Sequence, residues 1–71
     1  MQVVENAVVV CRSRGEKDVC IVENVNTGEQ ISLVNTKGID LKAGMEGEVV
    51  YLEGEVNQLE SFEAVMEEEL V

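Results

Sequence analysis

A chain of 71 residues has room for one small domain, residues 1–71, and its 3% aromatic content leaves Val, Leu and Ile to form the core. The formal net charge is −10, with 5 basic against 15 acidic residues, which argues against nucleic-acid binding because such binding depends on Lys and Arg. Histidine is absent, so the usual general base near neutral pH is missing, and we expect neither an enzyme nor a bound cofactor.

The start of the chain gives no sign of a targeting segment. Residues 1–5 lack a basic start followed by a sustained apolar stretch, and no apolar run reaches the roughly 18 residues of a membrane helix. Two cysteines are too few for a disulfide scaffold and agree with a reducing compartment. We therefore expect a cytoplasmic protein with no membrane segment.

Short apolar or alternating runs separated by polar turns predict strands along the chain. The runs are residues 7–11 (extended backwards by Val3 and Val4), 19–22, 31–33 and 49–52. The polar turns between them are residues 13–17, 26–29 and 35–38. A series of short strands with no long helical crossover is typical of a small all-β domain.

The stretch from residue 39 to residue 51 combines a loop with the start of a strand. Leu41 is a single apolar anchor, and Gly44 and Gly47 lie three residues apart just before the run that begins at Val49. Glycine permits a positive φ or a close backbone approach that a Cβ would prevent. We therefore predict a tight turn that leads into the fourth strand.

The C-terminal segment, residues 57–71, leaves two alternatives open. A helix would have Asn57 as its cap with Glu60 three residues on, whereas a last strand over residues 59–66 would end in a short turn at residues 67–70. Three consecutive glutamates oppose the dipole of a helix at its C-terminus, and a sheet needs its edge closed, so we favour the strand and keep a short helix or 3-10 turn as the alternative. The overall prediction is a small antiparallel barrel of about five strands in a meander, SH3-like or OB-like.

Residues 44–49, preceded by residues 39–42, resemble a signature of the variable (alpha) chain of ferredoxin-thioredoxin reductase. Residues 6–10 are similar to the early Val-rich strand of that family, and residues 62–64 with Glu69 and Leu70 are similar to its closing segment. The resemblance implies an SH3-like barrel that stabilises the catalytic subunit of a redox enzyme and carries no cofactor itself.

Charge and this resemblance together predict a surface for a larger protein partner. The last 29 residues, 43–71, hold nine acids and no base, whereas Arg12, Arg14 and Lys17 form a basic cluster in the first hairpin. Such a dipolar chain suits a basic partner, or self-association through the first hairpin or an edge strand. The predicted partner-binding residues are Met45, Glu46, Glu48, Tyr51, Glu53, Glu55 and Phe62.

A second function of a different class is an acidic protein that mimics nucleic acid and blocks a DNA- or RNA-binding protein. Its carboxylates would be those of Glu53, Glu55, Glu60 and Glu63. Binding by such a mimic should fall steeply with salt, whereas an accessory subunit should depend on an apolar patch.

The two cysteines raise one further hypothesis. If the first turn holds residues 14–17, Cys11 lies directly opposite Cys20 on the neighbouring strand, within reach of a disulfide. Cys11 and Cys20 would then be a redox pair. The alternative is that both thiols are inert, since buried cysteine commonly acts as a small apolar residue.

Overall fold

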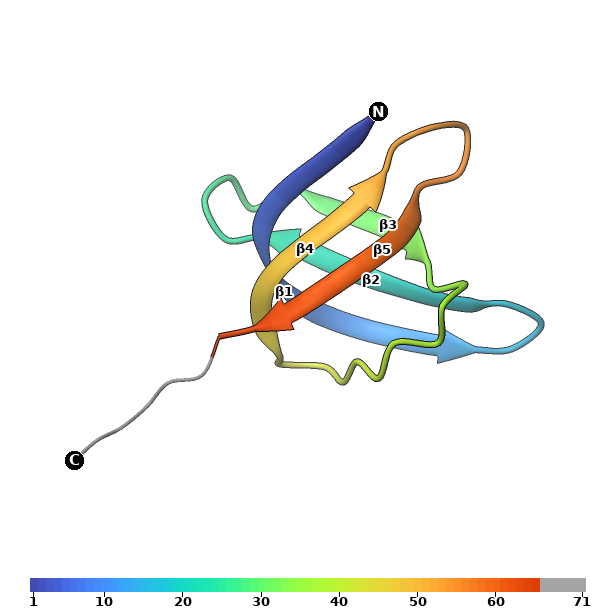
Figure 1. Ribbon diagram of the computed structural model, residues 1–71. Coiled ribbons are helices and arrows are strands. Elements are labelled where there is room, and N and C mark those ends of the chain that lie inside the picture. The colour runs from blue at the N-terminus through green and yellow to red at the C-terminus, as the bar shows by residue number, and fades with distance from the viewer. Residues whose placement is uncertain (66–71) are drawn as a thin grey trace.

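The computed structural model describes residues 1–65 and contains five β-strands and no helix in that range (Figure 1). The strands are β1 (Gln2–Arg14), β2 (Asp18–Asn24), β3 (Gln30–Val34), β4 (Glu46–Leu52) and β5 (Gln58–Ala64). Each of the first four contains one of the apolar runs of the sequence, and β5 overlaps the last strand predicted over residues 59–66. The prediction of a small all-β fold of about five strands is confirmed.

The strands close into a barrel in the order β1-β2-β3-β5-β4, with β1 paired to both β2 and β4. The predicted meander is therefore wrong, because β4 lies beside β1 and not beside β3. The sheet is also not wholly antiparallel, since β3 and β5 run parallel at their single pair, Val34 with Gln58. Of the two barrel types expected, this Greek-key order fits the OB-like one.

The first strand can serve two neighbours because it is long and contains a β-bulge. Val9 pairs with Val22, but Cys11 pairs with Ile21, so Val10 is an extra residue on β1. A bulge bends a strand and increases its twist. The bend lets the first half of β1 pair with β4 while the second half forms a hairpin with β2 (Figure 1).

The core is formed by the inward-facing residues of all five strands together with Leu41 from the loop between β3 and β4. Its fully or nearly fully buried members are Ala7, Val9, Cys20, Val22, Leu33, Leu41, Val49, Tyr51 and Leu59. Leu41 is 2% exposed, so its predicted role as the loop's anchor is confirmed.

The two glycines of the stretch 39–51 have different roles. Gly44 has a φ of 96°, as a tight turn before the strand requires. Gly47 instead lies within β4, opposite Ala7 of β1 and Ala64 of β5, where a Cβ would come 2.2 Å from the Glu63 carbonyl oxygen. The prediction of a turn holds for Gly44, whereas Gly47 permits close packing of three strands.

Arg12 of β1 links the first hairpin to the loop between β3 and β4. Its guanidinium donates to both carboxylate oxygens of Asp18 (2.8 and 2.6 Å) and to the carbonyl oxygen of Leu41 (3.2 Å), and its side chain is only 9% exposed. The hydrogen bonds between the two side chains raise the pKa of Arg12 and lower that of Asp18. Arg12 is thus a structural residue, and the predicted basic cluster is reduced to Arg14 and Lys17 at the hairpin tip.

The C-terminal segment is a strand over Gln58–Ala64, so a helix that begins after Asn57 is wrong for the described residues. Val50 pairs with Ser61 while Tyr51 pairs with Leu59, which leaves Glu60 as an extra residue in a second bulge. The Glu60 carboxylate accepts a hydrogen bond from Lys37 Nζ at 2.9 Å. The predicted turn at residues 67–70 lies outside the described residues.

Candidate functional site

The barrel wall is least complete at the seam between β3 and β5. Val34 N–H donates to the Asn57 carbonyl at 2.8 Å, and Val34 with Gln58 is the only registered pair of these two strands within residues 1–65. The rest of β3, toward its N-terminal end, faces the loop of residues 53–57 across the seam. β3 is therefore an edge strand over most of its length.

The backbone groups that face this seam follow from the pairing of β3 with β2. Asn24 N–H donates to the Glu29 carbonyl, and Asn35 N–H donates to the Asp18 carbonyl, so odd-numbered residues of β3 point their backbone groups toward β2. The N–H and C=O groups of Gln30 and Ser32 consequently point toward the seam, as those of Val34 do.

An open cleft of about 560 Å³ lies along the seam, between β3 and the loop of residues 53–57. Its lining residues are Val19, Glu29, Gln30, Ile31, Ser32, Val34, Tyr51, Glu53, Glu55, Val56 and Asn57. They combine apolar side chains with three carboxylates, and they include no Lys or Arg. The cleft can thus contact an apolar group and attract a positive charge.

Tyr51 lies where the cleft meets the core and is only 4% exposed. Burial raises the pKa of its phenol, and the negative charges of Glu5, Glu53 and Glu29 raise it further. Carboxylates from β1 and from two different loops thus act on the same phenol. Within residues 1–65, Glu5 Oε2 is a buried carboxylate oxygen without a hydrogen-bond partner.

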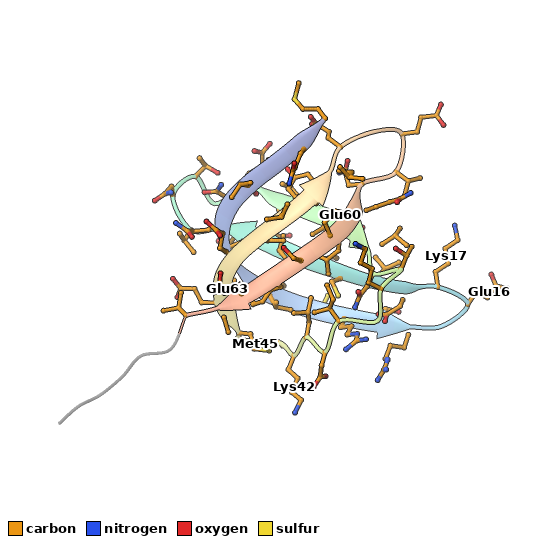
Figure 2. The ribbon with its side chains drawn as sticks, viewed as in Figure 1. Glu16, Lys17, Lys42, Met45, Glu60 and Glu63 are labelled. Atoms are coloured by element: carbon orange, nitrogen blue, oxygen red, sulfur yellow. The ribbon has the colours of Figure 1, made fainter. Side chains whose placement is uncertain are left out.

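The structure brings together three of the seven predicted partner-binding residues. Tyr51, Glu53 and Glu55 line the cleft. The other four do not: Glu46 and Glu48 are exposed on β4, whereas Phe62 and Met45 are partly buried and pack against the core. Met45 does so at the end of the barrel opposite the loop of residues 53–57 (Figure 2). The predicted surface is therefore at least two separate surfaces.

Sequence reasoning missed the half of the cleft that comes from β3. From sequence, Glu29 is predicted only as a turn residue and Ile31 only as a strand residue, and Val56 lies between predicted elements. The seam depends on the order of the strands, which no local pattern discloses. The length of β3 is no signal either, because β3 pairs with β2 along all five of its residues but registers with β5 at one.

The predicted pairing of Cys11 with Cys20 is wrong. Arg12 lies opposite Cys20, and Cys11 lies opposite Ile21, because the bulge at Val10 shifts the register by one residue. A shift of one residue turns a side chain to the other face of the sheet. Cys20 is consequently buried in the core, where burial raises the pKa of its thiol, and Cys11 is exposed.

In the described part of the chain, no group of three or more His, Cys, Asp or Glu side chains is placed to hold a metal ion. No helix in residues 1–65 is long and apolar enough to cross a membrane. Comparison of the chain with protein-family models, curated protein sequences and solved structures found no match. The candidate site therefore rests on the geometry of the cleft.

Proposed function

We propose that this protein is a non-enzymatic interaction module that binds a larger protein through the cleft between β3 and the loop of residues 53–57. The observation that supports this proposal best is the coincidence of a strand edge, which has one registered pair with β5 within residues 1–65, and an acidic cleft that contains some apolar side chains. Proteins usually cover or shorten such an edge, because exposed backbone groups attract other chains. Here the edge borders a recess that another chain can enter.

As part of the same proposal, the partner is the catalytic subunit of a redox enzyme in the cytoplasm. The resemblance of residues 39–49 to an accessory chain of ferredoxin-thioredoxin reductase supports this finer assignment. Leu41 and Gly47 of that stretch hold the loop and β4 in place, and β4 carries Tyr51 into the cleft. Residues 39–49 would then hold the binding site in place without contacting the partner themselves.

Selection of peptides from a random display library tests the module. Selection would be run on the wild-type protein and on Val56→Arg, in which a long side chain fills the cleft beside Glu53 and Glu55. Val4→Arg is the matched control, because Val4 and Val56 are 54% and 52% exposed and only Val56 lines the cleft. We expect peptides that bind the wild type and Val4→Arg but lose at least tenfold in affinity for Val56→Arg. Equal binding to all three proteins would contradict the proposed site.

One observation supports the second candidate, an acidic mimic of nucleic acid. Glu48 of β4 and Glu63 of β5 are directly opposed on adjacent strands, an arrangement that destabilises a sheet. The four carboxylates predicted for the mimic do not form one surface, however. Glu60 is paired with Lys37, and Glu53 and Glu55 line the cleft. The mimic would therefore act through the outer face of β4 and β5.

The two candidates differ in the residues that they require. A mimic should compete with duplex DNA for DNA-binding proteins, and the double substitution Glu48→Gln, Glu63→Gln should abolish this competition. The same substitution should leave peptide binding in the cleft unchanged and should slightly raise stability, since it removes a repulsive pair. Failure of the protein to compete with DNA at low salt would exclude the mimic.

A further inference from the structure

We propose that the cleft receives an extended, Lys- or Arg-bearing segment of the partner, which adds to β3 as a further strand at Gln30 and Ser32. This inference rests on the proposed function and specifies the chemistry of the ligand. In this binding mode, main-chain hydrogen bonds supply affinity, while alternate side chains supply specificity.

The first argument is the direction of the backbone groups. Val34 N–H donates across the seam to the Asn57 carbonyl, which shows that even-numbered residues of β3 present their N–H and C=O groups on that side. Gln30 and Ser32 have the same orientation, and both side chains are exposed. A segment that lies beside the N-terminal part of β3 could therefore form hydrogen bonds with both residues. It would take the place that β5 would fill if β5 began before Gln58.

The second argument is the shape of the recess. Successive side chains of a strand point to opposite faces. On an added strand, those that point toward the barrel would meet Ile31 and Tyr51, while the others would emerge near Ser32 and the rim. The recess thus offers an apolar contact to every second residue of an extended segment.

The third argument is charge. Glu29, Glu53 and Glu55 all line the cleft, and within residues 1–65 no Lys or Arg lines it. Carboxylates on the rim favour a segment with Lys or Arg at the positions that emerge, and they disfavour an acidic one. They would also repel most segments of a second copy of this chain, because the chain has a net charge of −10.

The experiment uses two synthetic heptapeptides, Lys-Val-Lys-Val-Lys-Val-Lys and its counterpart with Glu in place of Lys. Binding is followed by the fluorescence of Tyr51, the only tyrosine in a chain without tryptophan. Amide hydrogen exchange measured by NMR locates the contact. We expect the basic peptide to bind, to protect the amides of Gln30 and Ser32, and to weaken with added salt; we expect the acidic peptide not to bind.

Two double variants of equal charge test the role of the rim. Glu53→Gln with Glu55→Gln should weaken the basic peptide about 2- to 30-fold, the range for loss of two exposed ion pairs. Glu16→Gln with Glu46→Gln, at two exposed positions outside the cleft, should change the affinity by less than about twofold through net charge alone. Equal losses in the two variants would show only general attraction to an acidic protein and would refute the proposal.

Two further changes test strand addition itself. Ser32→Pro removes the N–H that faces the seam at a position where an edge strand tolerates proline. A peptide with N-methyl groups on alternate residues removes the same hydrogen bonds without any change to the protein. Each should reduce binding at least fivefold, and undiminished binding of the methylated peptide would refute strand addition.

The outcomes also separate this inference from the proposed function. If display-selected peptides depend on Val56 but leave the amides of Gln30 and Ser32 unprotected, the interaction module stands and strand addition fails. If the protein itself protects these amides at high concentration and sediments as a dimer, a second copy occupies the edge, and the basic-partner proposal is refuted. If no peptide binds in the cleft, both fail.

Discussion

Gly47 offers the sharpest test of how the barrel is packed. A Cβ at this position would lie 2.2 Å from the Glu63 carbonyl oxygen, 2.7 Å from Ala64 Cα and 2.8 Å from the Glu63 carbonyl carbon. An unstrained contact is about 3.5 Å long, so β5 would have to retreat by about 1.3 Å. All three atoms belong to the backbone, so no side-chain rotation relieves the overlap.

We expect Gly47→Ala to lower the free energy of unfolding by about 3 kcal/mol, at the upper end of the usual cost of overpacking. A domain of this size has a total stability of roughly 4–11 kcal/mol, so the loss is a large part of it. The melting temperature should fall by about 12–24 °C. Urea and thermal unfolding, followed by circular dichroism and by Tyr51 fluorescence, measure both quantities.

The matched control is Gly15→Ala, at the tip of the first hairpin. A Cβ there meets nothing within 4 Å, and the φ of Gly15 is outside the left-handed region. Its stability should change by less than about 1 kcal/mol. A second control is Gly47→Ala with Ala64→Gly, which should not recover stability because the overlap is with backbone. If Gly47→Ala is within about 1 kcal/mol of the wild type, the close approach of β4 and β5 is refuted.

Three further predictions follow from single groups. The hydrogen bond from Arg12 lowers the pKa of Asp18 below its ordinary value of 3.8. The Asp18 carboxylate therefore contributes its full stabilisation above pH 3.8, and this stabilisation is lost as the pH falls through the lower native pKa. Urea unfolding as a function of pH should show this loss, and Asp18→Asn should lack it. Iodoacetamide at pH 8 should label exposed Cys11 rapidly and buried Cys20 only on unfolding, and equal rates by mass spectrometry would contradict the bulged register. The absorbance of tyrosinate should appear only above the ordinary phenol pKa of 10.0, and Glu53→Gln should move the titration of Tyr51 downward, because one of the charges that raise it is removed.

The strands were predictable because their signal is local. Each apolar run of the sequence became part of a strand, and the resulting register of the first hairpin is correct from Ala7 to Val9. It fails beyond Val10, since a bulge within a run of three valines leaves no mark in composition or periodicity. One extra residue was enough to move Cys11 out of line with Cys20.

The order of the strands was not predictable by the same means. The loop of residues 35–45 carries the chain beneath the barrel and places β4 beside β1, and this route depends on the bend in β1 and on the side chain of Arg12 (Figure 1). Three of the eleven residues that line the cleft, Tyr51, Glu53 and Glu55, were predictable from sequence because they are close along the chain. The residues of β3 that complete the cleft required the fold.

The single pair between β3 and β5 also has a consequence for how the molecule opens. Separation of this seam breaks the pairing of Val34 and Gln58 and the ion pair of Lys37 with Glu60, while the ladders of β1 with β2 and with β4 stay intact. Local opening should therefore need much less free energy than global unfolding. The barrel resembles a cylinder with a lengthwise slit, whose two edges are joined by one registered backbone pair within residues 1–65. A partner strand bound in the slit would join those edges and stiffen the whole domain.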